Sequence, residues 1–194
     1  MDVKSPAVEV EEPEKERLNN AISVTVALLA AFMSVTKIKD DNLVQAMQQA
    51  KVNAVDTWGE YQAKKLKHHL AELGINQLNA LELTAPPSAA ARLEEMRQGY
   101  QSQIQRYVGE EKTLMEKAKD FEREYDRLNL RDDQFDLSDA ALSISLGVLA
   151  VAALASRPWL LIMAWGFGAL GLATGLAAIF RLPFHPDWLV RWLS

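Results

Sequence analysis

Three long segments of the sequence contain no charged side chain, and they restrict the fold more than any other feature. The segments are residues 18–36, 140–156 and 159–180. A helix of about 20 apolar residues is long enough to cross the hydrocarbon core of a bilayer, so each segment can form a membrane span. The sequence therefore predicts an all-α membrane protein with transmembrane helices at 18–36, 139–156 and 159–180.

A cleaved signal peptide is the alternative interpretation of the first segment. The preceding residues are acidic rather than basic, and no small-x-small cleavage site follows, so we favour a membrane span. Residues 1–17 contain two prolines and the glutamates Glu9, Glu11, Glu12, Glu14 and Glu16. This composition buries too little apolar surface to order the chain, and it predicts a disordered acidic tail.

Residues 37–136 are predicted to form one long antiparallel helical hairpin between the first and second spans. The double proline Pro86-Pro87 cannot continue a helix, and it places the apex of the hairpin at residues 84–88. In the second arm, the spacing alternates between three and four residues, which is the seam of a coiled coil. The seam positions are Leu93, Arg97, Tyr100, Ile104, Tyr107, Glu111, Leu114, Ala118, Phe121, Tyr125 and Leu128.

The first arm carries an apolar stripe that should pack against this seam. The stripe consists of Leu43, Met47, Ala50, Ala54, Trp58, Tyr61, Leu66, Leu70, Leu73 and Leu81. Its phase drifts after Tyr61, as in an eleven-residue repeat. Folding at the double proline is expected to place Met47 near Tyr125 and Trp58 near Leu114.

Charges on the two arms agree with this pairing. The basic run Lys64, Lys65 and Lys67 would face the acidic pair Glu110 and Glu111. Exposed ion pairs contribute only ~0.2–1 kcal/mol each, so they select the register of the arms. Buried Leu, Tyr, Phe and Trp side chains must supply the stability.

Polar residues 131–136 separate the predicted hairpin from the second span, and Ser138 or Asp139 is expected to cap a new helix. Arg157-Pro158 leaves room only for a tight turn, so the second and third spans should form a transmembrane helical hairpin. Residues 181–194 carry paired Trp and Arg side chains, which suit the lipid headgroup region. They predict an interfacial tail.

One face of the last span is formed by small residues, among them Gly168, Gly171 and Gly175. Small residues about four positions apart allow helices to approach closely inside a bilayer, where lipid provides no hydrophobic driving force. We interpret these glycines as a candidate helix-packing face. It can pack against the chain's own second span or against a second copy, and both alternatives stay open.

The sequence predicts no catalytic residue, no cofactor and no metal. A two-helix hairpin has no water-excluding pocket in which polar groups converge, and the chain has no cysteine. His68 and His69 are adjacent on a helix and should diverge by about 100°, so His68 with Glu72 is at most a metal half-site on a solvated face. No basic face predicts nucleic-acid binding, and the spans hold no charged residue for a proton relay.

The run Trp58–Leu70, WGEYQAKKLKHHL, contains a W-x-x-Y-Q-A-K pattern. With this pattern the chain resembles a bacterial family of small membrane proteins, the domain of unknown function numbered 4337. The resemblance covers about residues 18–180 and implies one span, a helical middle and two closing spans, without implying a reaction, cofactor or ligand. We treat Trp58, Tyr61, Gln62 and Lys65, which lie together on the helix, as a candidate interaction patch for a protein partner.

Lysines and arginines near the spans predict the orientation in the membrane. The side with the amino-terminal tail has Lys4, Lys15, Arg17 and Arg157, whereas the other side has Lys37, Lys39, Arg127, Arg131, Arg181 and Arg191. The excess predicts a cytoplasmic hairpin and an external amino-terminal tail. The family resemblance implies a bacterial inner membrane.

These features favour a non-enzymatic, membrane-anchored coiled-coil scaffold or assembly protein whose copies associate with one another. A long helical pair with a seam and no pocket is typical of such proteins. An oligomeric channel-like protein is the first alternative, because small-residue faces and hydroxyl groups in the spans permit it. The second alternative is an accessory subunit of a larger membrane complex, contacted through the glycine-rich last span.

Overall fold

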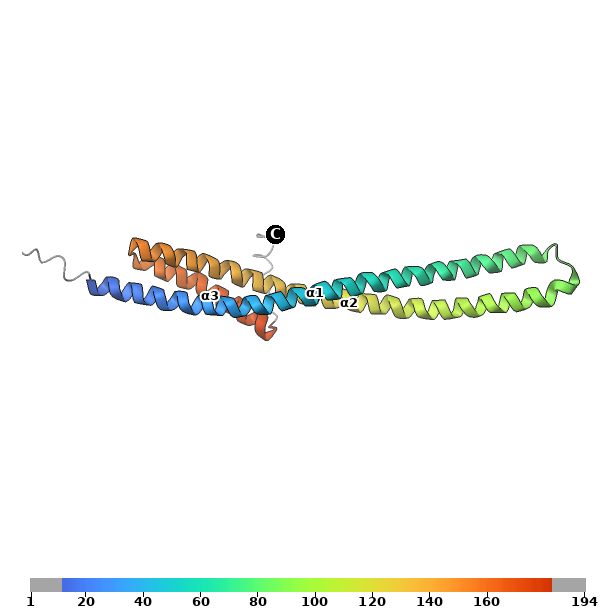
Figure 1. The fold of residues 1–194 in the computed structure, drawn as a ribbon, viewed down its shortest axis with the longest axis horizontal. Helices are drawn as coiled ribbons and strands as arrows, with labels where there is room; N and C mark the ends of the chain where they lie inside the picture. The colour runs from blue at the N-terminus through green and yellow to red at the C-terminus, as the bar shows by residue number, and fades with distance from the viewer. Residues whose placement is uncertain (1–11, 183–194) are drawn as a thin grey trace, which may run out of the picture. The chain divides into compact units, whose positions relative to one another are not determined.

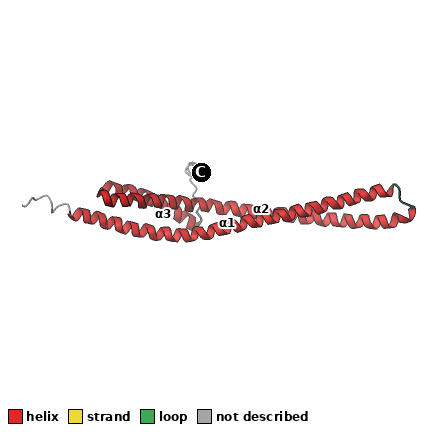
Figure 2. Ribbon diagram, turned by 45° about the horizontal axis from the view of Figure 1, so that its top comes forward, coloured by secondary structure: helices red, strands yellow, loops and turns green. Residues whose placement is uncertain are grey.

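The computed structural model describes residues 12–182, and these residues form helices joined by short connections (Figure 2). Helix α1 is Glu12–Glu82, a 3-10 helix (η1) is Pro87–Ala89, α2 is Ala90–Ala155 and α3 is Pro158–Phe180. Within residues 12–182 there is no strand, which confirms the all-α prediction. Helix α1 begins before the first predicted span, so residues 12–17 of the predicted disordered tail are helical; residues 1–11 and 183–194 lie outside the described part.

Contacts divide the chain into two units. Unit 1 comprises residues 1–46 and 127–194, and unit 2 comprises residues 47–126. Helices α1 and α2 each contribute to both units, whereas α3 belongs to unit 1. We describe each unit by itself.

Unit 1 packs the beginning of α1, the end of α2 and all of α3 side by side (Figure 1). Its core is apolar, and Leu142, Leu149 and Ala164 are completely buried. Leu29 of α1 joins this core. Helix α2 ends at Ala155 and α3 begins at Pro158, as the tight turn at Arg157-Pro158 predicts.

The outer surface of unit 1 is apolar as well. Large side chains from all three helices point outward, and Leu28, Leu154 and Phe180 are each more than half exposed. The three helices each contain a stretch long and apolar enough to cross a membrane. A surface of this kind is costly in water and favourable in lipid, so unit 1 has the properties of a membrane-embedded helix bundle.

Glycines of α3 bring its backbone close to the other two helices of unit 1. A Cβ atom on Gly171 would lie 2.7 Å from Leu142 Cγ, and one on Gly175 would lie 2.6 Å from Ser138 Oγ and 2.8 Å from a ring carbon of Phe32. A Cβ on Gly168 would meet Ser145 Oγ at 3.2 Å. The structure thus places the candidate helix-packing face Gly168, Gly171 and Gly175 against α2 and α1 of the same chain.

Hydroxyl groups connect the same helices. Ser138 Oγ donates to the carbonyl oxygen of Gly171 at 2.7 Å, and Ser145 Oγ donates to that of Ala164 at 2.7 Å. Both serines are completely buried. The helix cap predicted at Ser138 or Asp139 is therefore wrong: α2 continues through residues 131–139 because one face, including Phe135 and Ser138, stays buried against its neighbours.

In unit 2, α1 and α2 lie side by side and are joined by the loop before η1 (Figure 1). Every position of the predicted α2 seam from Leu93 to Tyr125 is buried or half-buried. The alternation of three and four residues in the sequence therefore identified the face of α2 that packs on α1.

The predicted stripe of α1 is correct only in its first half. Met47, Ala50 and Ala54 are buried, but Leu66, Leu70, Leu73 and Leu81 are exposed, with more than half of each side chain in solvent. The shielded positions instead continue the alternation of three and four without drift: Ala50, Ala54, Thr57, Tyr61, Lys64, His68, Ala71, Ile75 and Leu78. The eleven-residue repeat predicted after Tyr61 is wrong.

The size of the α2 side chains explains this choice of face. Tyr100 lies directly over Gly74, because a Cβ atom at Gly74 would be 2.7 Å from the tyrosine ring. Ala71 and Gly74 leave room for such rings, whereas a leucine at the same positions would overpack the contact. Helix α1 therefore turns Ala71 and Gly74 toward α2, whereas Leu66, Leu70 and Leu73 face solvent.

We expect the substitution Gly171→Ile to destabilise unit 1, by about 1–3 kcal/mol, because the added side chain would overlap Leu142 and its backbone amide. Gly166→Ile is the matched control, since nothing lies within 4 Å of a Cβ atom at that position. Thermal unfolding in detergent micelles, followed by tryptophan fluorescence, measures both. Equal effects of the two substitutions would contradict the packing described for α3.

Candidate interaction surfaces

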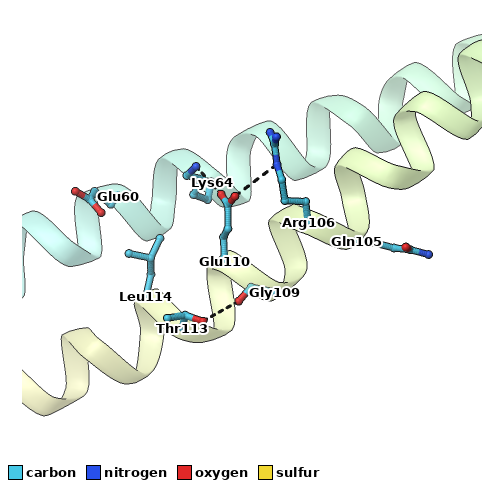
Figure 3. Close-up of a pocket in the computed structure, with 8 residues that line it drawn as sticks. All are labelled: Glu60, Lys64, Gln105, Arg106, Gly109, Glu110, Thr113 and Leu114. Atoms are coloured by element: carbon cyan, nitrogen blue, oxygen red, sulfur yellow. Dashed lines mark hydrogen bonds and ion pairs between the residues drawn. The ribbon is translucent and has the colours of Figure 1, made fainter.

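An ion-pair cluster joins α1 and α2 in the middle of unit 2 (Figure 3). Glu110 accepts from Lys64 across the two helices, and Arg106 Nε lies 3.5 Å from the other carboxylate oxygen of Glu110. The hydrogen bond from Lys64 lowers the pKa of Glu110 below its ordinary value. Of the predicted basic run and acidic pair, this cluster confirms the proximity of Lys64 to Glu110.

A groove of ≈ 580 Å³ lies beside this cluster. It is lined by Glu60, Lys64, Gln105, Arg106, Gly109, Glu110, Thr113 and Leu114 (Figure 3). The carboxylate of Glu110 is occupied by its two basic neighbours, and Thr113 donates its hydroxyl to the carbonyl of Gly109 at 3.1 Å.

Two histidines lie one turn further along α1. His68 Nδ1 lies 3.0 Å from Glu111 Oε1 on α2, and His69 Nδ1 lies 2.9 Å from Glu72 Oε2. The imidazole rings do not diverge as predicted: they stack at 5.6 Å with an interplanar angle of 11°, so both side chains reach Glu72. Within residues 12–182, no group of three or more His, Cys, Asp or Glu side chains is arranged to hold a metal ion.

The candidate interaction patch divides into a half-buried part and an exposed part. Trp58 Nε1 donates to Glu122 Oε1 of α2 at 2.9 Å, which is two turns beyond the predicted neighbour Leu114. Tyr61 packs edge-on against Trp58, with ring centroids 5.4 Å apart. Gln62 is exposed, and Lys65 is exposed with its amine 5.9 Å from the Tyr61 ring.

Contacts across unit 2 occur in opposite order along the two helices. The amine of Lys51 lies 5.1 Å from the Tyr125 ring, and at the other end Arg97 bonds Glu82. Five contacts between the helices show this order: Lys51 with Tyr125, Trp58 with Glu122, Lys64 with Glu110, Gly74 with Tyr100, and Glu82 with Arg97.

In unit 1, a carboxyl cluster lies where the polar part of α2 faces α1. Asp40 is 7% exposed, and its carboxylate accepts from Lys37 Nζ at 3.0 Å. The carboxyl group of Asp132 on α2 lies near the same carboxylate. The pKa of Asp132 is raised from 3.8 to about 6. Burial is the largest cause, and the neighbouring charges of Asp136, Asp40 and Asp133 add to it.

The end of α3 is held by side chains from α2. Arg131 donates through Nε and Nη2 to the carbonyl oxygen of Ala178, at 3.3 and 3.2 Å, and Gln134 Nε2 donates to that of Leu182 at 3.1 Å. The carbonyl oxygen of Ala178 also accepts from the backbone N–H of Arg181 at 3.4 Å, so Arg131 adds bonds from a second helix to a helix end that is already capped. Arg131 thereby fixes the end of α3 against α2.

Residues 18–181 match the domain of unknown function DUF4337. The chain belongs to the DUF4337 family. No curated protein and no solved structure is significantly similar to it. The family match agrees with the resemblance in the W-x-x-Y-Q-A-K segment and extends over nearly the whole described part of the chain.

Two features of this DUF4337 protein were not found by reading its sequence. The first is the Asp40–Asp132 contact, which joins residues far apart in the chain. The second is the role of Arg131 at the end of α3, because residues 131–136 were interpreted as a polar break. The apolar residues Phe135, inside this segment, and Leu137, directly after it, are the signal that could have revealed a continuous helix, and both are buried.

The raised pKa of Asp132 predicts a pH-dependent stability for the DUF4337 protein. Between about pH 4 and about pH 6 the folded state holds a proton that the unfolded state has released, so stability is greatest at the acidic end and falls as the pH rises through 6. Asp132→Asn keeps a hydrogen-bond donor without the charge. We expect it to stabilise the protein by roughly 1 kcal/mol at neutral pH, after allowance for solvent screening.

Thermal unfolding in detergent at about pH 4 and about pH 7.5 measures this effect. Asp41→Asn is the control, because Asp41 is largely exposed and lies 4.0 Å from Lys37. The control should retain the pH dependence. A flat profile for the unmodified protein, or an unchanged profile in Asp132→Asn, would contradict the assignment.

Proposed function

We propose that the protein is a non-enzymatic, membrane-anchored scaffold whose copies associate through unit 2. The observation that carries this proposal is the contrast between the two units. Unit 1 exposes large apolar side chains around an apolar core, as a bundle in lipid does, whereas α2 of unit 2 presents charged side chains outward. The first property anchors the protein, and the second presents a water-exposed helix pair to partners.

In this proposal, unit 2 is an antiparallel coiled-coil hairpin. The opposite order of contacts between α1 and α2 supports it, as do the alternating spacings of three and four on both helices. The Lys64–Glu110 pair and the packing of Tyr100 on Gly74 contribute to its register. The stability comes from the buried seam, because exposed ion pairs contribute little.

The absence of an enzymatic activity is part of the proposal. The groove beside Glu110 is open to solvent, and Lys64, Arg106 and Glu110, three of the four ionisable residues that line it, are paired with one another. Catalysis requires polar groups that converge on a site from which water is excluded. A groove on the surface of two packed helices does not provide such a site.

The proposed location is a bacterial inner membrane, with unit 2 in the cytoplasm and the amino terminus outside. The excess of Lys and Arg beside the unit 2 ends of the spans supports this orientation. Buried hydroxyls favour an anchor over a channel, because Ser138, Ser145 and Thr174 all donate to backbone carbonyls of the same chain. Hydroxyls used in this way hold helices together and do not line a path for ions.

Mass measurement by light scattering tests the proposal in detergent. We expect the protein moiety to have the mass of two or more 21.7 kDa chains. We also expect no ion flux from protein-containing liposomes. A mass of a single chain over a wide range of concentration would contradict self-association. Selective ion flux above that of empty liposomes would favour a channel instead.

A further inference from the structure

One face of α1 in unit 2 is apolar and has no partner within the chain. Leu66, Leu70 and Leu73 are 61%, 56% and 51% exposed, and Val52 and Val55 are 53% and 60% exposed. These residues recur with the period of a helix. We call the face the outer stripe, and its members are Gln48, Val52, Val55, Gly59, Gln62, Leu66, Leu70, Leu73, Gln77 and Ala80.

The outer stripe lies on the side of α1 opposite α2. Leu66, Leu70 and Leu73 each follow a shielded residue of the seam by two positions, which corresponds to about 160° around the helix. No member of the stripe carries a charge over more than thirty residues of sequence. A helix with two apolar faces is expected to bury both of them.

The corresponding outer face of α2 is different. Its exposed residues include Glu95, Arg106, Lys112, Glu116 and Arg123. A face of this composition is satisfied by water. The contrast between the helices therefore marks α1 alone as the element that lacks a neighbour.

The charges that flank the outer stripe fit a second copy of the same helix. In two parallel, in-register helices, some residues lie beside the interface, directly before a stripe member that follows a gap of four. Each such residue lies near the residue five positions later in the other copy. This rule pairs Lys51 with Asp56 of the second copy, and the symmetric pair forms on the other side. The same rule places Trp58 near Ala63 and Lys65 near Leu70 of the second copy, so it brings no like charges together.

We propose that the outer stripe is the interface through which two copies associate, with the two α1 helices parallel and in register. The parallel orientation follows from the membrane anchor, because copies in one bilayer leave it in the same direction. Gly59 leaves open space on the stripe, which lets the two backbones approach there. This inference rests on the proposed scaffold function and names the surface responsible for it.

The first test removes the apolar character of the stripe in the full-length protein. In the triple variant Leu66→Gln, Leu70→Gln and Leu73→Gln, we expect the mass in detergent to fall to one half of that of the unmodified protein. Helicity should be unchanged, because all three side chains are exposed and glutamine is a good helix former. The double variant Met96→Gln and Val108→Gln is the matched control, since these exposed α2 side chains lie outside the stripe, and its mass should be unchanged.

The second test uses the absence of native cysteine. Single cysteines at Leu66, Leu70 or Leu73 in membrane vesicles should form disulfides between copies under mild oxidation, whereas cysteines at Ser102 or Gln105 on α2 should not. Same-site disulfides along the whole stripe are expected only for parallel, in-register helices. Disulfides at Leu66 alone, the tested position nearest the centre of the stripe, would indicate antiparallel helices and overturn the proposal.

The outcomes separate this inference from the proposed function. If the unmodified protein has the mass of a single chain, the scaffold proposal itself fails. If oligomers persist in the triple variant and stripe cysteines form no disulfides, only the assignment of the stripe is overturned. If the protein has the mass of a single chain and its stripe cysteines do not react with a water-soluble maleimide, lipid covers the stripe. That result also overturns the assignment.

Discussion

The contact between α1 and α2 in unit 2 depends on a match of side-chain sizes. Helix α2 supplies aromatic side chains, and α1 makes room for one of them where Tyr100 packs on Gly74. Within unit 2 α1 is an unbroken helix, so turning Gly74 toward α2 also sets the directions in which the neighbouring side chains point. The exposed leucines at Leu66, Leu70 and Leu73 are a direct consequence, and they create a second face that needs a partner.

Unit 1 uses the same principle in a different solvent. The glycines of α3 admit Leu142 and Phe32 at distances that no larger residue would allow, and buried serines bond across to backbone carbonyls. In lipid, close packing and hydrogen bonds between helices replace the hydrophobic effect as the source of association. Other large apolar residues, such as Leu28, Leu154 and Phe180, point outward, and Arg131 donates to the carbonyl oxygen of Ala178 near the end of α3.

The sequence was sufficient to predict the helical class, the apolar spans and the face of α2 that packs, because these follow from local composition and period. It was insufficient for α1, where two apolar stripes compete. Leucines are the stronger local signal, but the choice of face depends on the shape of α2, which the period of α1 does not contain. The local period also does not contain contacts between distant residues, such as Asp40 with Asp132. The continuity of α2 through residues 131–139 depends on such contacts as well, so only the structure showed both.

The distance between α1 and α2 is the most direct test of the account. Pulsed electron resonance measures the distance between two spin labels attached to introduced cysteines. One pair is placed at Glu60 and Thr113, which both line the groove, and a second pair at Asn76 and Gln98, nearer the loop. Packed helices have axes about 10 Å apart, so both pairs should give short distances, on the order of 20–30 Å with the labels included. If the helices were instead opened out end to end, the Glu60–Thr113 distance would be about 60 Å or more. Such a distance would contradict the packed helix pair on which the interpretation rests.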